Sequence, residues 1–458
     1  MEAFEHQSMV YQRAKDREYF ALFLEQGLGK TKIAIDLLEY HFTNHKIDAA
    51  IVVTTKGLMG NWAYTELPKH SECHHSKYIW NKSGTLPAKH ENILAYFIVN
   101  IDALIGDRIV PVLREFFNQY KNVAFVLDES TVAKNIKAKR TKNAIAIAQR
   151  CKYRYIMSGT PVTNSPMDLF SQCQILSKGV LGHNSLHSFK GVYADEVKVT
   201  MGNRSFNKIV GYRNLDELTD RIQKFSSILK KKDCLNLPDK IYRTVPVDFT
   251  PQQAVIYKDL SEKAVAYVEE NEITVVNTLS MITKLLQICA GQMKIGNDYT
   301  TIPNNRLDVL EELIEECPGK TIVWTSFVGT ALDIRDRLES RAVHLPSGLD
   351  VDKRHEIITA FREGDTKVLI ANPASAGHGI TLTESSNVIY YSNSWNYEYR
   401  AQSEDRNHRI GQTESVLYTD LITPNTVEQK VVALLQNKKD LANMIITPED
   451  IRKVFDLE

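Results

Sequence analysis

Residues 25–31, with the sequence EQGLGKT, constrain the fold of this chain more than any other short segment. They follow an apolar run at 20–24 that predicts a strand, and they precede a helical pattern at 31–42. Glycines between a strand and a helix permit a tight turn, whose backbone amides and helix N-terminus can hold phosphate oxygens. The sequence therefore predicts a phosphate-binding loop on an α/β scaffold.

Each residue of this loop has an expected role. Gly27, Leu28 and Gly29 would surround the phosphates of a nucleotide, Lys30 would contact the β- and γ-phosphates, and Thr31 would ligate Mg²⁺. The first glycine of the general pattern is absent, because Leu24 stands in its place. The alternative is a glycine-rich turn that carries an exposed lysine.

The strand and helix patterns predict two α/β halves around a helical middle. Short apolar runs alternate with helical segments in both halves, which is typical of parallel sheets with crossover helices. We expect divisions at 1–165, 166–300 and 301–458, with amphipathic helices at 215–229 and 252–270 and a helical tail at 426–445. The predicted strands are 20–24, 49–54, 97–99, 124–127 and 155–157 in the first half, and 321–325, 368–371, 388–391 and 416–421 in the second.

Composition excludes several classes of protein. With 458 residues, 43% of them hydrophobic and 24% charged, the chain is globular and long enough for several cores. Lys+Arg and Asp+Glu both number 56, so any surface for a polyanion must be a local basic patch. The six cysteines form no Cys-x-x-Cys pair, and neither a signal peptide nor a membrane-length apolar run is present. We expect a soluble protein of a reducing compartment, without a membrane partner.

An acidic pair follows the predicted strand at 124–127. Asp128 at the strand end can hold Mg²⁺ beside the phosphate loop, and Glu129 can orient and deprotonate water. Two acids after a strand are otherwise an ordinary solvated strand end. Together with the phosphate loop, the pair favours catalysis.

The segment QSEDRNHRIGQ at 402–412 places Gln402, Arg406 and Arg409 close together after a strand of the second half. Such arginines are surface charges in many proteins. They can also stabilise the charge that gathers on a γ-phosphoryl group, as an arginine finger supplied across a cleft. We expect a catalytic role for this segment, and either arginine can be the finger.

These motifs resemble, in order, those of the Swi/Snf-type ATPases of helicase superfamily 2, and the likeness extends over nearly the whole chain. FEHQ at 4–7 is similar to the motif that reads adenine, which implies that role for Gln7. The resemblance implies two RecA-like lobes, ATP and Mg²⁺ as cofactors, and a nucleotide contact at Gly379. The other matching segments are 25–31, 51–66 with Trp62 and Glu66, 127–135, 158–164, 235–240, 249–257, 285–291, 320–327, 372–396, 402–412 and 426–438.

The sequence departs from the family pattern in three ways. Thr131 stands where the acid box usually has a histidine, which puts the contact of that histidine in doubt, and Tyr397 replaces a proline after Trp395-Asn396. The chain also lacks the long insertions of chromatin remodellers. It therefore resembles the compact phage or bacterial members.

The resemblance implies that nucleic acid is held through its phosphates, with little sequence preference. A basic run can also be only a solvated face. A zinc site at His70, Cys73, His74 and His75 is a weaker alternative, because no second ligand pair has suitable spacing. The candidate nucleic-acid contacts are Lys56, Lys134, Lys137, Lys139, Arg140, Lys142, Lys230–Lys232, Thr160, Thr163, Ser375, Gly377 and Trp395.

Three functions follow as hypotheses. The first is an ATP-driven translocase on double-stranded DNA, and the second is a helicase that separates strands or remodels forks. The third is a nucleotide-gated module that recruits replication or recombination proteins without useful hydrolysis. We expect a monomer in the cytoplasm, which is that of the bacterial host if a phage encodes the chain.

Overall fold

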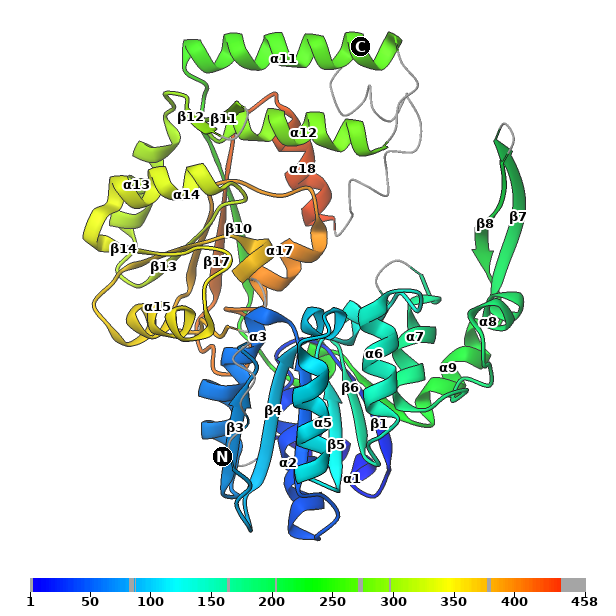
Figure 1. Ribbon diagram of the computed structural model, residues 1–458. Helices are drawn as coiled ribbons and strands as arrows, with labels where there is room; N and C mark the ends of the chain where they lie inside the picture. The colour runs from blue at the N-terminus through cyan, green and yellow to red at the C-terminus, as the bar shows by residue number, and fades with distance from the viewer. Residues whose placement is uncertain are drawn as a thin grey trace. The chain divides into compact units, whose positions relative to one another are not determined.

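The computed structural model describes residues 3–81, 86, 88–162, 165–201, 204–270, 275–295, 298–376 and 380–437. Its contacts divide the chain into two compact units, residues 1–236 and 237–458 (Figure 1). Each unit is built around its own parallel sheet. The predicted α/β class with two lobes is therefore confirmed.

The first unit contains a seven-stranded sheet in which all paired strands are parallel. Apolar residues fill the central strands, as expected for a sheet covered on both faces. In the order β3-β4-β2-β5-β6-β1-β9, the strands are β3 (His75–Ile79), β4 (Leu94–Asn100), β2 (Ala49–Thr54), β5 (Val123–Leu127), β6 (Arg154–Met157), β1 (Tyr19–Leu24) and β9 (Ser226–Leu229).

Helices connect these strands, and several of them cover the sheet (Figure 1). The predicted helix after the phosphate loop is present. The helices of this unit are α1 (Glu5–Ala14), α2 (Lys30–Thr43), α3 (Lys56–Gly60), η1 (Asn61–Glu66), α4 (Leu67–His70), η2 (Ile101–Ile105), α5 (Ile109–Gln119), η3 (Ser130–Ala133), α6 (Lys139–Ala148), α7 (Asp168–Leu176), α8 (Leu186–Tyr193), α9 (Leu215–Gln223) and α10 (Lys231–Cys234).

The helix predicted over 215–229 is wrong in its second half. α9 ends at Gln223, and the next residues form β9, which pairs in parallel with β1 at the edge of the sheet. The amide of Ala21 donates to the Phe225 carbonyl, and that of Glu25 donates to the Leu229 carbonyl (both 2.9 Å). These bonds to β1 outweigh the local helical pattern.

The segment expected to be helical also contains a hairpin of β7 (Ala194–Met201) and β8 (Arg204–Tyr212). It follows α8 in the first unit. Contacts place the border between the two units at 236/237, inside the predicted middle region. The three-part division at 165 and 300 stays a prediction.

The second unit contains a six-stranded parallel sheet and a small antiparallel hairpin of β11 (Gln292–Ile295) and β12 (Asp298–Thr301). In the order β10-β17-β16-β13-β15-β14, the sheet strands are β10 (Lys240–Pro246), β17 (Val416–Ile422), β16 (Asn387–Tyr390), β13 (Thr321–Trp324), β15 (Val368–Ala371) and β14 (Ala342–Leu345). The helices are α11 (Pro251–Glu270), α12 (Val275–Cys289), α13 (Arg306–Glu316), α14 (Val328–Leu338), η4 (Glu339–Arg341), α15 (Val351–Glu363), α16 (Pro373–Ala376), α17 (Tyr397–Glu404) and α18 (Val427–Gln436).

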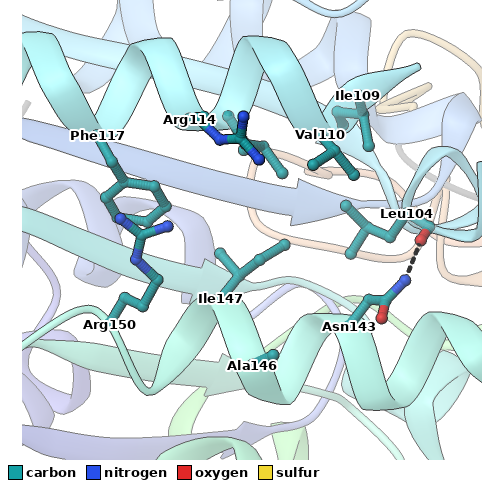
Figure 2. Close-up of a pocket in the computed structure, with 10 residues that line it drawn as sticks. Leu104, Ile109, Val110, Arg114, Phe117, Asn143, Ala146, Ile147 and Arg150 are labelled. Atoms are coloured by element: carbon teal, nitrogen blue, oxygen red, sulfur yellow. Dashed lines mark hydrogen bonds between the residues drawn. The ribbon is translucent and has the colours of Figure 1, made fainter. Parts of the chain in front are cut away.

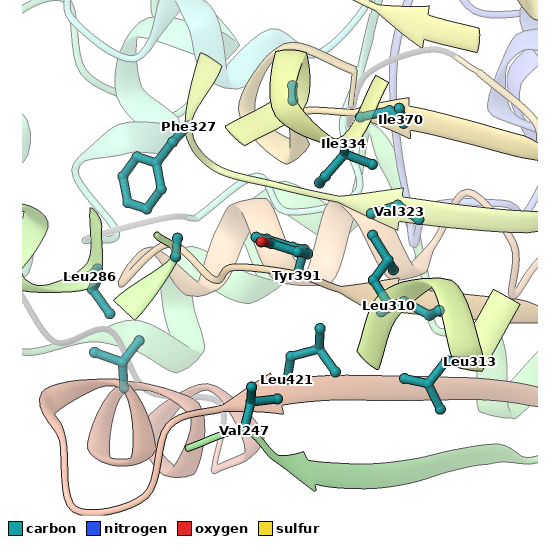
Figure 3. Packing of buried hydrophobic residues seen from close by; sticks show 14 of the residues in the cluster. Val247, Leu286, Leu310, Leu313, Val323, Phe327, Ile334, Ile370, Tyr391 and Leu421 are labelled. Carbon is teal, nitrogen blue, oxygen red and sulfur yellow. The ribbon is translucent and has the colours of Figure 1, made fainter. Parts of the chain in front are cut away.

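A large apolar core lies in this second unit (Figure 3). It joins the sheet strands, through Val323 and Ile370, to α12, α13 and α18, and Leu286 contributes from α12. The helical segment before the second sheet is therefore part of this unit. The predicted helical tail is described only as far as residue 437, so the remainder of that prediction lies outside the described residues.

A buried ion pair joins the start of α13 to α18. The Arg306 guanidinium pairs with Glu428 and also donates to the Tyr391 carbonyl (2.6 Å) and the Thr423 hydroxyl (3.0 Å). Both charged side chains are almost fully buried. Loss of one partner from such a pair costs about 3–5 kcal/mol, because the other charge stays buried without compensation.

Across the part of the chain that the structure describes, every helix is too short or too polar to cross a bilayer.

Candidate functional site

The phosphate loop occupies the turn between β1 and α2, as the sequence predicts. Gly27 and Gly29 adopt left-handed φ angles of 86° and 80°, which glycine adopts without strain. Lys30 begins α2, is buried, and its Nζ donates to the Leu24 carbonyl (2.9 Å). Thr31 occupies the first turn of the same helix. This geometry gives a helix N-terminus preceded by a tight glycine turn, which is the form of a phosphate site.

The first turn of α1 is fixed against this loop. Gln7 Nε2 donates to the Leu28 carbonyl (3.2 Å), and Gln7 Oε1 accepts from the Phe4 amide (3.1 Å). The ring of His6 also bonds to the Leu28 carbonyl through Nε2 (3.0 Å). Gly29 has φ 80°, and a Cβ there would lie 2.1 Å from Gln7 Nε2, so another residue would strain the loop and displace Gln7. No role was predicted for His6, although it neighbours the predicted residue Gln7.

The acidic pair lies at the end of β5. Asp128 is buried, and its carboxylate accepts from Trp62 Nε1 and from the Glu129 amide (both 2.9 Å). Burial raises the pKa of Asp128 to about 7 and the Glu129 charge adds to the rise, while the Trp62 hydrogen bond and the Lys30 charge oppose it. Glu129 adopts φ 52° and ψ 58°, a left-handed conformation that is uncommon outside glycine. Strain of this kind occurs at functional sites.

The segment after β6 lies against the phosphate loop. A Cβ at Gly159 would lie 2.8 Å from Gln26 Cγ and 3.5 Å from Lys30 Nζ. The neighbouring Thr160 is exposed, and its amide donates to Ser158 Oγ (3.1 Å). The structure therefore brings together the phosphate loop and the segment at 158–160, both of which the sequence singled out.

A buried glutamine on α7 joins this segment to the acidic pair. Ser130 Oγ donates to Gln172 Oε1 (2.6 Å), and Gln172 Nε2 donates to the Pro161 carbonyl (2.7 Å). Ser130 and Gln172 are both fully buried. The sequence analysis missed Gln172, because a glutamine in an apolar helix gives no motif.

The basic candidates of the first unit differ in their surroundings. Lys56, Lys134, Lys137 and Lys142 are exposed. Lys139 pairs with Asp107 (3.6 Å), and Arg140 pairs with Asp102 (2.7 Å). Among the three lysines at 230–232, Lys231 is buried. Its side chain is therefore not on the surface where we expected a nucleic-acid contact.

The arginine segment of the second unit begins in α17. Arg406 is buried, and its guanidinium donates to the carbonyls of Gln402 (2.9 Å) and Ile380 (3.3 Å). Gln402 is also buried and donates to Glu398 (3.1 Å). Arg409 is partly exposed, and its guanidinium has no hydrogen bond or ion pair to any described residue. The two arginines therefore occupy different environments.

A neighbouring network holds α17 on the second sheet. Arg400 pairs with Asp420 on β17 (2.5 Å) and with Glu404 (2.7 Å), and lies over the Tyr390 ring (3.5 Å to the centroid). Glu404 also accepts from Lys240 on β10 (2.8 Å). The sequence did not indicate this role for Arg400, because Asp420 lies 20 residues away along the chain.

The other candidates of the second unit are only partly described. Ser375 lies in α16, where its amide donates to the Asn372 carbonyl (3.2 Å). Trp395 is partly buried against the apolar core. The predicted contacts at Gly377, Gly379 and, in the first unit, Thr163 lie outside the described residues.

The zinc alternative gains no support. Among the described residues, no group of three or more His, Cys, Asp or Glu side chains is arranged to hold a metal ion. His70 pairs instead with Glu66 (3.4 Å), and Cys73 lies 3.8 Å from the Thr43 hydroxyl.

Comparison with known proteins identifies the family. The SNF2-related domain matches residues 9–294, which is more than half of the 458 residues. This chain is a member of the SNF2-related family. The conserved C-terminal helicase domain matches residues 305–411. The predicted resemblance to Swi/Snf-type ATPases is confirmed, and membership makes ATP the expected nucleotide.

Several curated relatives of this SNF2-related chain are named as helicases or translocases. An uncharacterized ATP-dependent helicase of Mycoplasma pneumoniae is 25% identical over 93% of this chain and 40% of its own length. The putative ATP-dependent helicase/translocase YwqA of Bacillus subtilis is 25% identical over 93% of the chain and 46% of its own length. The chain thus spans less than half of these two relatives.

A phage relative has a similar length. Putative protein p41 of Acyrthosiphon pisum secondary endosymbiont phage 1 is 20% identical over 96% of this chain and 97% of its own length. Among solved structures, the SWI2/SNF2 ATPase core of Sulfolobus solfataricus is similar both in complex with dsDNA and as the core domain. The complex has 25% identity, covers 100% of this chain and 98% of its own, and gives a TM-score of 0.44. The core domain has 24% identity, covers 100% and 95%, and gives a TM-score of 0.43.

Proposed function

We propose that this SNF2-related chain is a DNA-stimulated ATPase that couples hydrolysis of Mg²⁺-ATP to movement on duplex DNA. The observation that carries the proposal is the joint placement of three segments in the first unit. The phosphate loop, the acidic pair after β5 and the segment at 158–160 after β6 all lie at the carboxyl ends of parallel strands. Open α/β sheets bind their ligands at this edge.

The roles proposed for the nucleotide site follow from this geometry. The amides of Gly27 to Thr31 would surround the phosphates, and Lys30 would turn from the Leu24 carbonyl to the β- and γ-phosphates. Gln7, which already contacts the loop, would read the adenine. Glu129, next to Asp128 at the end of β5, would orient the attacking water and accept its proton.

The donor set fits a divalent cation. Thr31 offers a hydroxyl at a helix start, and Asp128 offers a carboxylate whose pKa is raised by burial and by the Glu129 charge, so a cation there would be favourable. One or two such ligands together with substrate phosphates are the usual Mg²⁺ set in proteins. When held by Thr31 and Asp128, Mg²⁺ would supply positive charge that neutralises the charge developing on the phosphates.

We propose that Arg409 is the arginine finger of the second unit. Its partly exposed guanidinium has no competing partner among the described residues, so it can pair with a phosphoryl group that arrives with the substrate. Arg406 would shape the segment through the carbonyls of Gln402 and Ile380. Gln402 would position α17, the helix that contains it, through its hydrogen bond to Glu398.

Nucleic acid would lie along the carboxyl edge of the first sheet. Lys56 follows β2, Lys134 and Lys137 follow β5, and Thr160 follows β6; these three strands are neighbours in the sheet. Exposed lysines in such a row favour contacts with backbone phosphates. Duplex DNA is the form that family membership favours. Ser375 and Trp395 would contribute from the second unit.

The ATPase rate tests this proposal directly. We expect duplex DNA to raise the rate of the full chain well above its basal value, and single-stranded DNA and RNA to raise it less. Phosphate contacts release counterions. A plot of the logarithm of the apparent association constant for duplex DNA against the logarithm of salt concentration should therefore have a slope of about −0.9 per phosphate contact. Lys30→Ala is the inactive control. A rate that RNA raises and duplex DNA leaves unchanged would contradict the proposal.

One observation favours fork remodelling as a second candidate. The β7–β8 hairpin carries apolar side chains that are exposed, Val197 (49%) and Val210 (61%), and exposed apolar side chains can act as a wedge between stacked bases. Unwinding of a forked duplex would support this candidate. Displacement of a third strand from a triplex without fork unwinding would favour the translocase.

A further inference from the structure

A surface groove lies between α5 and α6 on the first unit, apart from the proposed nucleotide site (Figure 2). Its volume is about 290 Å³. Leu104, Ile109, Leu113 and Ile147 form its apolar lining, and Asn143 Nδ2 donates to the Leu104 carbonyl (2.5 Å), which fixes η2 to α6. The walls of the groove are therefore helices that pack against the rest of the first unit.

Apolar side chains continue from the groove to the surface. Val110 is 47% exposed at one end, and the nearby Ile105 is 44% exposed. Phe117 is half-buried at the opposite end, where the guanidinium of Arg150 covers its ring (3.9 Å to the centroid). Exposed apolar side chains beside an apolar groove favour a binding site.

The groove also carries uncompensated positive charge. Arg114 on α5 and Arg150 after α6 both line it and are exposed, and neither forms an ion pair with a described residue. The nearby Lys139 and Arg140 are instead paired with aspartates. Glu115, the only acidic residue of α5, accepts a hydrogen bond from Gln119 (3.4 Å).

We propose that this groove binds a short acidic peptide segment of a partner protein. A large aliphatic or aromatic side chain of the peptide would enter between Leu113 and Ile147, and neighbouring carboxylates would pair with Arg114 and Arg150. The volume suits one or two side chains. A nucleic-acid backbone fits less well, because charged phosphates against the apolar lining would lose hydration without gaining hydrogen bonds there. The proposal does not depend on the proposed function.

Fluorescence polarisation of a labelled peptide composed of aspartate, leucine and phenylalanine tests this proposal on the full chain. We expect saturable binding that weakens at least tenfold when Arg114→Glu and Arg150→Glu are combined, because both charged contacts are lost and replaced by repulsion between like charges. Ala146→Trp, which fills the groove at an exposed position, should weaken binding as well. The exposed Lys69→Glu on α4 is the matched control and should leave binding unchanged.

Three results would overturn the proposal that the groove binds an acidic peptide, and a fourth would assign it to nucleic acid. Absence of saturable binding, or equal affinities of the wild-type and charge-reversed chains, would overturn the proposal. So would retained affinity for a peptide whose aspartates are replaced by lysines. If charge reversal weakens binding of a short DNA duplex and the peptide does not bind, the groove is a nucleic-acid surface.

A second inference concerns Gln172 and rests on the proposed function. This side chain bonds both to Ser130, directly after the acidic pair, and to Pro161, directly after the exposed Thr160. It also donates to the Asp168 carbonyl (2.9 Å) within its own helix, which fixes its orientation. Because it is fully buried, water cannot replace these bonds. A shift of the 160–161 segment would therefore be transmitted to the acidic pair.

We infer that Gln172 is a positioning residue that couples nucleic-acid binding to ATP hydrolysis. Gln172→Leu should keep most of the basal ATPase rate and lower the stimulation by duplex DNA about tenfold. Gln174→Leu is the matched control, because Gln174 is a buried glutamine of the same helix that bonds to the His183 carbonyl (3.1 Å) and the Gly179 amide (3.2 Å). It should lower Tm similarly and leave the stimulation ratio unchanged.

The ratio of stimulated to basal rate decides this inference. A wild-type ratio in Gln172→Leu, or an equal loss in both variants, would overturn it. A wild-type chain that duplex DNA fails to stimulate would instead contradict the proposed function. The two failures are therefore distinguishable.

Discussion

Replacement of Glu129 by glutamine will remove most ATP turnover and leave nucleotide binding intact. Glutamine keeps the size and hydrogen-bonding capacity of the side chain but cannot accept the proton of the attacking water. Loss of a general base typically lowers the rate by about 10²–10⁴. Since Glu129 already adopts its left-handed backbone conformation with a side chain of the same shape, Tm should change little.

Lys30→Ala provides a useful contrast. Lys30 is proposed to hold the phosphates, so its loss should weaken ATP binding as well as turnover. Lys32→Ala on the same helix is the matched control, because Lys32 is buried and pairs with Asp36 (2.8 Å); its loss should lower Tm and leave ATP binding unchanged. Single-turnover ATPase rates and equilibrium binding of a fluorescent ATP analogue measure both quantities. Wild-type turnover in Glu129→Gln would exclude the proposed base.

Substitution of the two arginines will separate catalysis from folding. Arg409→Ala should lower kcat by about 10³–10⁵, the range for loss of an arginine finger, with little change in Tm. Arg406→Ala should lower Tm, because the buried carbonyls of Gln402 and Ile380 would lose their donor. The kcat of Arg406→Ala should fall less than that of Arg409→Ala, because the substitution affects catalysis only by displacing Arg409.

Lysine substitution sharpens the comparison. Arg409→Lys keeps the charge but loses the planar fork of donors, so it should recover only part of the rate. Thermal unfolding and kcat are measured for all three variants in saturating ATP. A wild-type kcat in Arg409→Ala together with a large loss in Arg406→Ala at unchanged Tm would reverse the assignment.

The fold was predictable where a strand is recognisable from its own residues as a run of apolar side chains. The runs at 20–24, 49–54 and 124–127 are apolar at nearly every position because both faces of a parallel sheet are covered. The edge strands β3, β9, β10 and β14 were missed, because they are more exposed or more polar and their pairing depends on a neighbour distant in sequence. The motif residues of the phosphate loop and acidic pair were predictable because glycine conformation and strand ends are local properties.

The supporting residues were not predictable from the sequence alone. His6, Gln172 and Arg400 act through partners that folding brings to them, such as the Leu28 carbonyl, Ser130 and Asp420. A buried polar side chain needs a hydrogen-bond partner, but the local sequence does not indicate which residue that partner is. The same reason explains why Arg406 and Arg409 could not be distinguished before their burial was known.

Displacement of a third strand from a DNA triplex tests the central proposal most directly. The full chain, ATP and Mg²⁺ are added to a duplex that carries a fluorescent triplex-forming strand, and release is followed over time. We predict ATP-dependent release by the wild-type chain, and none by Lys30→Ala or Glu129→Gln. ATP hydrolysis without release, or release that Glu129→Gln supports equally well, would contradict coupled movement on duplex DNA.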